Sequence, residues 1–191
     1  DIHGKDMYQM SLDTGVLRRE HVDPIRKELR AIRPMDAVFD SRYVRRLNGK
    51  RVKKGATKMD LADRLTEDIQ AFKARHDCKR LVMIWCGSTE TYLEKNGAHE
   101  TPAAFEKALK ESEPSISPSM IYAYAAIREG IPFINGAPNL TENIPALISL
   151  AKKHQSPVAG DDFKTGQTLM KTVIAPALKA RMLGVRGWFS T

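Results

Sequence analysis

The chain has 191 residues, of which 31 are Lys or Arg and 23 are Asp or Glu, so its formal charge at pH 7 is +8. A hydrophobic fraction of 42% and a charged fraction of 28% are typical of a globular protein and exclude disordered, collagen-like and coiled-coil chains. The longest apolar run, residues 81–86, is too short to cross a bilayer. We therefore expect no membrane partner. With two cysteines and no signal segment, we expect a reducing cytoplasmic location.

The positive charge predicts an anionic partner, for which nucleic acid and a phosphorylated metabolite are the two candidates. The densest basic stretch covers residues 42–54, and Tyr43 is its only aromatic residue. Nucleic-acid-binding stripes usually interleave aromatic residues or follow one helix face. We therefore expect this stretch to be a solvated or interface loop, and we expect no nucleic-acid partner.

The periodicity of apolar residues predicts helices and strands in alternation. Helices are expected at residues 5–16, 20–31, 57–76, 102–111, 118–129, 144–154 and 167–182, with Thr57 as the N-cap of the third. Strands are expected at 36–39, 81–86, 131–134, 158–159 and 185–189, the second of them buried on both faces. Strands joined by crossover helices predict an α/β fold with a parallel sheet.

Three loops that mix Gly with Ser, Thr, Asn or Asp follow expected strands, at residues 87–91, 135–141 and 160–168. Ligands of open parallel sheets bind beyond the carboxyl ends of the strands, where these loops should gather. Together the three loops predict a cofactor or substrate cleft at one edge of the sheet. Each loop taken singly also fits an ordinary turn or a capped helix.

The third loop, GDDFKTGQT, leads into an expected helix that Thr165 can cap. The free N–H groups of a first helical turn attract phosphate. Lys164 precedes them, and Lys171 lies seven residues on, at nearly the same helix face. Two such amines could hold a phosphate and move a proton, with Asp161 and Asp162 orienting them or contacting a ribose or a cation. The alternative is a capped helix with a solvated lysine and an Asp-rich turn.

The other two loops carry weaker signals. The Asn side chains of residues 135–139 could contact a nicotinamide carboxamide or sugar hydroxyls, or they could tie down their own loop. Residues 87–89 can bring backbone and hydroxyl groups close to a ligand. We interpret Cys86 as a small core residue and not as a nucleophile. The five histidines show no metal-ligand spacing, and no metal-ligating residue is predicted.

In this order, VMIWCGSTE at 82–90, IPFINGAP at 131–138 and GDDFKTGQT at 160–168 resemble the myo-inositol-1-phosphate synthase family. The resemblance covers essentially the whole chain, and GDDFKTGQT is its most specific part. The family's Gly-rich pyrophosphate loop and its later lysines are absent from this sequence, and Leu169 stands where many members carry Lys. We therefore expect the sequence to be the middle of a longer synthase.

The resemblance implies an NAD-dependent isomerase that converts D-glucose 6-phosphate to 1D-myo-inositol 3-phosphate in inositol and phospholipid biosynthesis. It implies part of a Rossmann-like NAD-binding domain, a parallel sheet with helices on both faces, over residues 1–155. The start of an α+β catalytic and oligomerisation domain follows over 156–191. The implied partners are NAD, a phosphorylated sugar and further subunits of a homotetramer, with a monovalent or divalent cation as an additional option.

The resemblance also implies roles for individual residues. Lys164 would be the proton shuttle or oxyanion partner, and Lys171 would stabilise the phosphate or the enolate. The implied NAD contacts are Gly87, Ser88, Thr89, Asn135, Gly136, Ala137 and Asp161.

Two other classes of function remain open at this point. One is a related NAD-dependent dehydrogenase, or a synthase-like homologue without synthase activity. The other is a basic binding domain that is not an enzyme. Only a synthase would make inositol phosphate without a net change in NADH.

Overall fold

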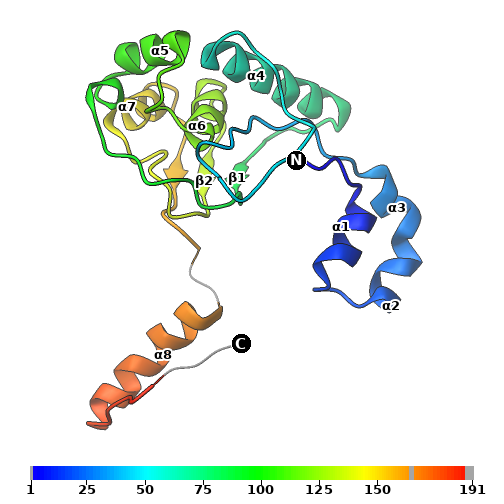
Figure 1. Cartoon of the computed structure of the whole chain (residues 1–191), viewed down its shortest axis with the longest axis vertical. Helices are drawn as coiled ribbons and strands as arrows, with labels where there is room; N and C mark the ends of the chain where they lie inside the picture. Colours follow the sequence, from blue (N-terminus) through cyan, green and yellow to red (C-terminus); the bar gives the residue numbers. More distant parts are fainter. Residues whose placement is uncertain (1, 164–165, 188–191) are drawn as a thin grey trace.

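The computed structural model describes residues 2–163 and 166–187, and its strands form one parallel sheet beneath a group of helices (Figure 1). The sheet contains β1 (Met83–Trp85), β2 (Phe133–Asn135) and β3 (Val158–Ala159) in that order. Phe133 of β2 lies between Met83 of β1 and Val158 of β3. The predicted α/β class and parallel sheet are confirmed. Because β3 pairs with β2, the sheet continues past residue 155, the expected end of the first domain.

Four helices form the group above the sheet in Figure 1: α4 (Lys58–Arg75), α5 (Pro102–Glu111), α6 (Pro118–Arg128) and α7 (Pro145–Lys153). A short 3-10 turn, η2 (Gly97–His99), precedes α5. Thr57 and Asp60 begin α4 with a capping box, in which each side chain accepts a hydrogen bond from the other residue's N–H. The predicted positions of all four helices are confirmed to within one or two residues.

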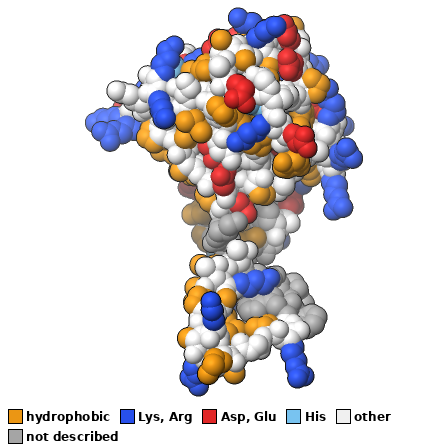
Figure 2. Space-filling view, turned by 90° about the vertical axis from the view of Figure 1, so that its left-hand side faces the viewer, with side chains coloured by type: hydrophobic (Ala, Val, Ile, Leu, Met, Phe, Trp, Pro, Cys, Tyr) orange, Lys and Arg blue, Asp and Glu red, His pale blue; other side chains and the backbone are white. Residues whose placement is uncertain are grey.

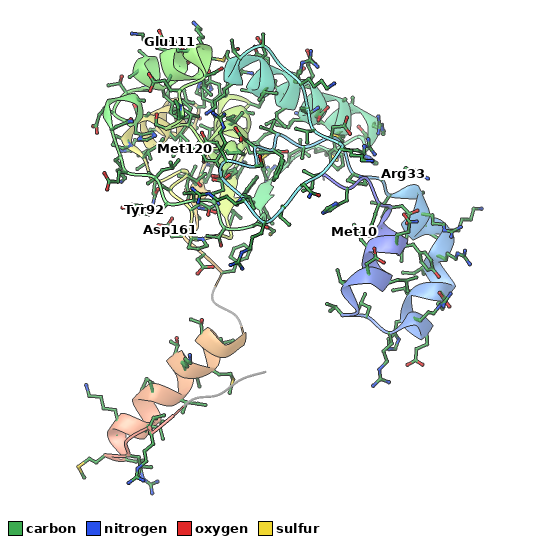
Figure 3. The ribbon with its side chains drawn as sticks, viewed as in Figure 1. Met10, Arg33, Tyr92, Glu111, Met120 and Asp161 are labelled. Carbon is green, nitrogen blue, oxygen red and sulfur yellow. The ribbon has the colours of Figure 1, made fainter. Side chains whose placement is uncertain are left out.

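The core lies around α6, whose small alanines let neighbouring helices approach closely. The side chain of Met120 on this helix is fully buried inside the helical layer (Figure 3). Further large apolar side chains that are fully buried around it come from α5, α6, α7, β2 and the segments between them: Phe105, Leu109, Ile116, Ile121, Ile127, Phe133, Ile144 and Leu147. Burial of such side chains contributes about 1.5–3 kcal/mol each to the stability of the fold.

The N-terminal helices α1 (Met7–Thr14), α2 (Arg19–Val22) and α3 (Arg26–Ala31), with the 3-10 turn η1 (Asp23–Ile25), form an arm beside this body (Figure 1). The helix expected at 20–31 is divided at η1, because Pro24 lacks the N–H that would continue the helix.

The prediction of a strand at 36–39 is wrong. Ala37 makes only an isolated bridge with Val52, outside the sheet. The next N–H, that of Val38, is donated to the hydroxyl of Tyr122 at 3.0 Å instead of to a neighbouring strand. A side chain of α6 therefore replaces the ladder partner that a strand would need.

The expectation that the strand at 81–86, observed as β1, is buried on both faces is also wrong. Ile84 of β1 is 53% exposed and the preceding Val82 is 57% exposed, whereas Phe133 on the other face of the sheet is fully buried. A parallel strand is buried on both faces only where both faces are covered. The described residues cover the face of Ile84 incompletely. Cys86, at the end of this strand, is exposed and is not the core residue that we expected.

Helix α8 (Gly166–Ala180) stands apart from the sheet and its helices (Figure 1). Hydrophobic side chains lie on the surface of this lower part (Figure 2). Leu169, which stands where many family members carry Lys, is 48% exposed on this helix. Residues 185–187 form no strand, and the rest of the strand expected at 185–189 lies outside the described residues. No described helix is long and apolar enough to cross a membrane.

Lys58, the first residue of α4, is a buried cation that joins three parts of the chain. Its Nζ donates to the Tyr43 hydroxyl at 2.9 Å and to the carbonyl oxygens of Glu113 and Ile116 at 2.6 and 2.5 Å. Tyr43 in turn donates to the carbonyl oxygen of Pro114 at 2.6 Å. Burial lowers the pKa of Lys58 from 10.5 to about 8.

We expect the free energy of unfolding of the wild-type protein, relative to Lys58→Met, to rise between about pH 8 and pH 10.5. In this range the folded state has lost the Lys58 proton and the unfolded state still holds it, so stability rises by at most about 1.4 kcal/mol per pH unit. Burial raises the pKa of Tyr43 to about 12, above this range. Urea unfolding of both proteins at pH 7 to 10 measures the difference, and a difference that shrinks with pH would contradict the prediction.

Candidate functional site

The loops that follow the three strands meet at the carboxyl edge of the sheet. The N–H of Gly136, after β2, donates to the carbonyl oxygen of Trp85 in β1 at 2.8 Å. The N–H of Phe163, after β3, donates to the carbonyl oxygen of Gly136 at 3.2 Å. The middle loop is thus joined to the end of β1 and to the third loop, and the N–H of Glu90 in the first loop donates to Oδ1 of Asn139 in the middle loop at 2.9 Å. The predicted gathering of the three loops at one edge is confirmed.

Two glycines permit this close approach. A Cβ at Gly136 would lie 2.7 Å from the carbonyl oxygen of Trp85 and 2.7 Å from Cε2 of Phe163. A Cβ at Gly160 would lie 2.5 Å from the carbonyl oxygen of Asn135, and the φ of Gly160 is +150°, a conformation that other residues rarely adopt. Glycine is therefore required for steric reasons at the centre of the candidate site.

Asn135 has its side chain committed within the middle loop. It is fully buried, its Nδ2 donates to the carbonyl oxygen of Asn139 at 3.1 Å, and its Oδ1 accepts from the N–H of Ala137 at 3.0 Å. Of the two roles that the sequence left open, the structure shows the tying of the loop. Contacts of Asn135, Gly136 and Ala137 with a cofactor stay predictions.

The first loop borders two grooves. Gly87 and Ser88 line one of about 560 Å³, together with Trp85 and the segment from Ala37 to Leu47. Nε1 of Trp85 is buried and has no hydrogen-bond partner within the described part of the chain. A buried donor without a partner is costly.

The second groove, of about 500 Å³, adjoins the first, since Val44, Leu47 and Ser88 line both. Ser88 and Thr89 line it together with Arg45 and Arg46, which belong to the basic stretch at 42–54. The arginines place positive charge beside the candidate loop and suit an anionic group. The sequence pattern predicts only a solvated or interface loop for this stretch. Its position beside residues 88–91 could not be predicted, because the two segments lie far apart in the sequence.

The third loop carries backbone strain and acidic side chains. Asp161 and the next residue, Asp162, have φ of 71° and 78°, in the left-handed region. Asp161 lies where the chain leaves the body toward α8 (Figure 3), and it accepts hydrogen bonds from Nδ2 of Asn143 at 3.2 and 3.3 Å. Nearby Glu142 is 4% exposed, and burial, followed by the charge of Asp161, raises its pKa. Sequence reasoning missed Asn143 and Glu142, since no periodicity distinguishes a buried polar residue in a loop.

A second buried polar group that sequence reasoning missed joins the first two loops to the start of α6. Glu90 is 7% exposed and its carboxylate accepts from the N–H of Ser119 at 2.9 Å and from its hydroxyl at 2.6 Å. The Ser119 hydroxyl lies 2.8 Å from that of Thr141 and 3.0 Å from that of Ser117. All four side chains are buried.

Of the two predicted catalytic lysines, only Lys171 lies within the described residues. Lys164 and the expected cap Thr165 lie outside the described residues. Lys171 is exposed on α8, where it lines a hollow of about 500 Å³ with Lys179 and Met182. Since α8 stands apart from the sheet (Figure 1), the structure does not bring Lys171 to the three loops. The roles of both lysines stay predictions.

Comparisons with known proteins agree with the resemblance of the three loops. An NAD-binding family model described as myo-inositol-1-phosphate synthase matches residues 1–183. Inositol-3-phosphate synthase 1 of Bacteroides thetaiotaomicron is 47% identical over 192 residues, which are all of this chain and 45% of that protein. An inositol-3-phosphate synthase of Mesembryanthemum crystallinum is 38% identical over 92% of this chain and 36% of its own length.

The fold gives the same result. The crystal structure of inositol-3-phosphate synthase from Caenorhabditis elegans matches 95% of this chain and 36% of its own with a TM-score of 0.88, at 28% identity. The chain thus spans less than half of the length of each of these relatives. The match of the family model over residues 1–183 and the 47% identity confirm the resemblance. The chain belongs to the myo-inositol-1-phosphate synthase family.

Proposed function

We propose that the protein to which these residues belong is an inositol-3-phosphate synthase, which converts D-glucose 6-phosphate to 1D-myo-inositol 3-phosphate. The observation that carries the proposal is the meeting of the three loops at one edge of the sheet, where Gly136 and Gly160 allow backbone approaches that a Cβ would block. The loops contain the GDDFKTGQT sequence. Membership of the family supports the same activity.

The residues present fit NAD as the cofactor. Gly87 and Ser88 border a groove that Trp85 also lines, and Arg45 and Arg46 line the neighbouring groove with Ser88 and Thr89, where they add positive charge. Bound NAD supplies a hydride acceptor that later returns the hydride. The chain contributes orientation through residues 87–89 and 135–137, and Asp161 contacts a ribose or the nearby amines.

The proton transfers and the charge of the substrate fall to lysines in this proposal. Lys164 moves a proton at the sugar or stabilises the developing oxyanion, because an amine in a partly desolvated cleft has a lowered pKa and can do either. Lys171 holds the phosphate or the enolate, which requires that α8 face the loops in the longer protein. The formal charge of +8 suits a doubly anionic sugar phosphate.

The division into domains, the assembly and the location are also proposals. We place the NAD-binding part up to β3, since β3 pairs with β2, and the start of the catalytic and oligomerisation part at α8. The half-exposed apolar side chains of α8, such as Met170 and Val173, support packing against further parts of a homotetramer. We propose a cytoplasmic location and no nucleic-acid partner.

Product analysis tests the activity. The full-length protein, incubated with NAD and glucose 6-phosphate, should form an inositol phosphate without a net change in absorbance from NADH. Accumulation of NADH would indicate a related dehydrogenase instead. Salt-dependent binding of DNA without NAD binding would indicate a basic binding domain.

We expect the isolated 191 residues to bind NAD weakly or not at all and to be inactive. The pyrophosphate of a dinucleotide normally rests on a Gly-rich turn and the helix N-terminus behind it, and none of the glycines here forms that pattern. Calorimetric titration of the 191 residues, with the full-length protein as the positive control, measures the difference. Micromolar affinity of the isolated residues would mean that the cofactor site is misplaced.

Lys171→Ala in the full-length protein should lower kcat/KM for glucose 6-phosphate by about 10–100-fold. Loss of one charge-assisted hydrogen bond to a phosphate or enolate oxygen accounts for an effect of this size. Lys179→Ala, which removes another amine of α8, is the matched control and should stay near wild type. Equal activity of the two variants would remove Lys171 from the site.

A further inference from the structure

Glu90 is a buried carboxylate that the proposed chemistry does not use. It lies at the end of the first loop, is 7% exposed, and accepts hydrogen bonds from the N–H and the hydroxyl of Ser119 in the first turn of α6. The partial positive charge of a helix N-terminus favours an anion at this position. Burial nevertheless raises the pKa of Glu90, so the hydrogen bonds offset the cost of burying the carboxylate only in part.

The carboxylate also determines how the neighbouring hydroxyls are oriented. A serine hydroxyl has a single proton, and that of Ser119 is donated to Glu90 at 2.6 Å. The hydroxyls of Thr141 and Ser117, at 2.8 and 3.0 Å, must then donate to the Ser119 oxygen. Thr141 belongs to the second loop and Ser119 to α6, so one carboxylate connects both to the first loop.

The backbone of Glu90 makes a second connection to the same loop. Its N–H donates to Oδ1 of Asn139 at 2.9 Å, and the carbonyl oxygen of Asn139 accepts from the Asn135 side chain. The next residue, Thr91, donates its N–H to the carbonyl oxygen of Tyr43 at 2.8 Å. The first loop is therefore held on one side by the second loop and on the other by the segment that carries Arg45 and Arg46.

An apolar side chain in this position would fill the same space without burying a charge, and buried ion sites are often replaced by apolar groups with no loss of stability. An apolar side chain would accept no hydrogen bond and would not fix the orientation of the loop, whereas the carboxylate accepts two hydrogen bonds from one residue of α6. We propose that Glu90 is a positioning residue that holds residues 87–91 and 135–141 in register for NAD. This inference rests on the proposed function.

Two variants of the full-length protein separate register from packing. Glu90→Met keeps the length of the side chain but removes the carboxylate that accepts from both Ser119 donors, and the Ser119 N–H is left without an acceptor. Glu90→Gln keeps an acceptor for the Ser119 N–H, and its amide can donate to the Ser119 hydroxyl if that hydroxyl turns toward Thr141. Glu106→Met is the matched control. Glu106 lies on α5, away from the loops, and its carboxylate accepts a hydrogen bond from the hydroxyl of Tyr124 at 3.1 Å.

We expect Glu90→Met to raise KM for NAD at least about tenfold, because the two loops are no longer held in register. At saturating NAD, kcat should stay within about threefold of wild type, because the residues of the loops themselves are unchanged. Glu90→Gln should restore KM to within about threefold of wild type, and Glu106→Met should leave it unchanged. Amide hydrogen exchange should speed up at Gly136 and Glu90 in Glu90→Met alone, with no change in α5.

Three outcomes would overturn the proposal: unchanged exchange at both amides in Glu90→Met, an unchanged KM for NAD despite faster exchange, or failure of Glu90→Gln to restore KM. A wild-type protein that makes no inositol phosphate would refute the proposed function instead. In that case NAD titration of the wild type and Glu90→Met decides the inference: a tenfold or greater loss of affinity supports it, and equal affinity overturns it.

Discussion

Lys164→Met in the full-length protein is expected to lower turnover of glucose 6-phosphate by about 10²–10⁴-fold, because a positioned proton carrier contributes this much to the rate. NAD affinity should stay close to wild type, since we propose that NAD is held by residues 87–89, 135–137 and Asp161 and not by this amine. Methionine keeps the length and the apolar stem of the side chain, so the loop should keep its packing. Steady-state kinetics and NAD titration of the same preparation measure both quantities.

The control for this change is Lys179→Met, which removes an amine from α8, 17 residues after Asp162. We expect its turnover to equal that of the wild type. If Lys164→Met retains more than about half of the wild-type activity, where loss of a proton carrier costs orders of magnitude, then Lys164 is a surface lysine. The catalytic amine would then have to come from another part of the longer protein.

Gly160→Ala is expected to lower the free energy of unfolding by about 2–5 kcal/mol, through positive-φ strain and overpacking together. The new Cβ would lie 2.5 Å from the carbonyl oxygen of Asn135 and 2.7 Å from its N and Cβ. These are backbone and fully buried atoms, so they cannot move aside as the end of a flexible side chain could. The shift of the urea unfolding midpoint measures the effect.

Gly97→Ala is the matched control, because a Cβ at Gly97 meets no atom within 4 Å. Its stability should lie within about 0.5 kcal/mol of wild type or slightly above it. NAD affinity of the longer protein should fall with Gly160→Ala and not with Gly97→Ala, since Gly160 joins the third loop to the second. Equal unfolding midpoints for the two variants would show that the loops can separate without loss of stability.

The local signals in the sequence predicted the elements well. Thr57 with Asp60, and Pro102 and Gly130 at helix ends, act on the backbone within one turn, so their effect is readable from neighbouring residues. The positions of the loops followed from the same patterns, because residues after parallel strands must share one edge of the sheet. The sequence of residues 160–168 was specific enough to point to the family before any fold was known.

What the local patterns could not reveal depends on residues distant in the chain. Ile84 is apolar in sequence but half exposed, since exposure depends on what covers that face of the sheet. The commitment of the Asn135 amide to its own loop, and the burial of Glu90 against Ser119, 29 residues away, arise from packing between elements. Polar residues carry no periodicity that separates buried from solvated positions, and hydrogen-bond partners far apart in sequence meet only when the chain folds.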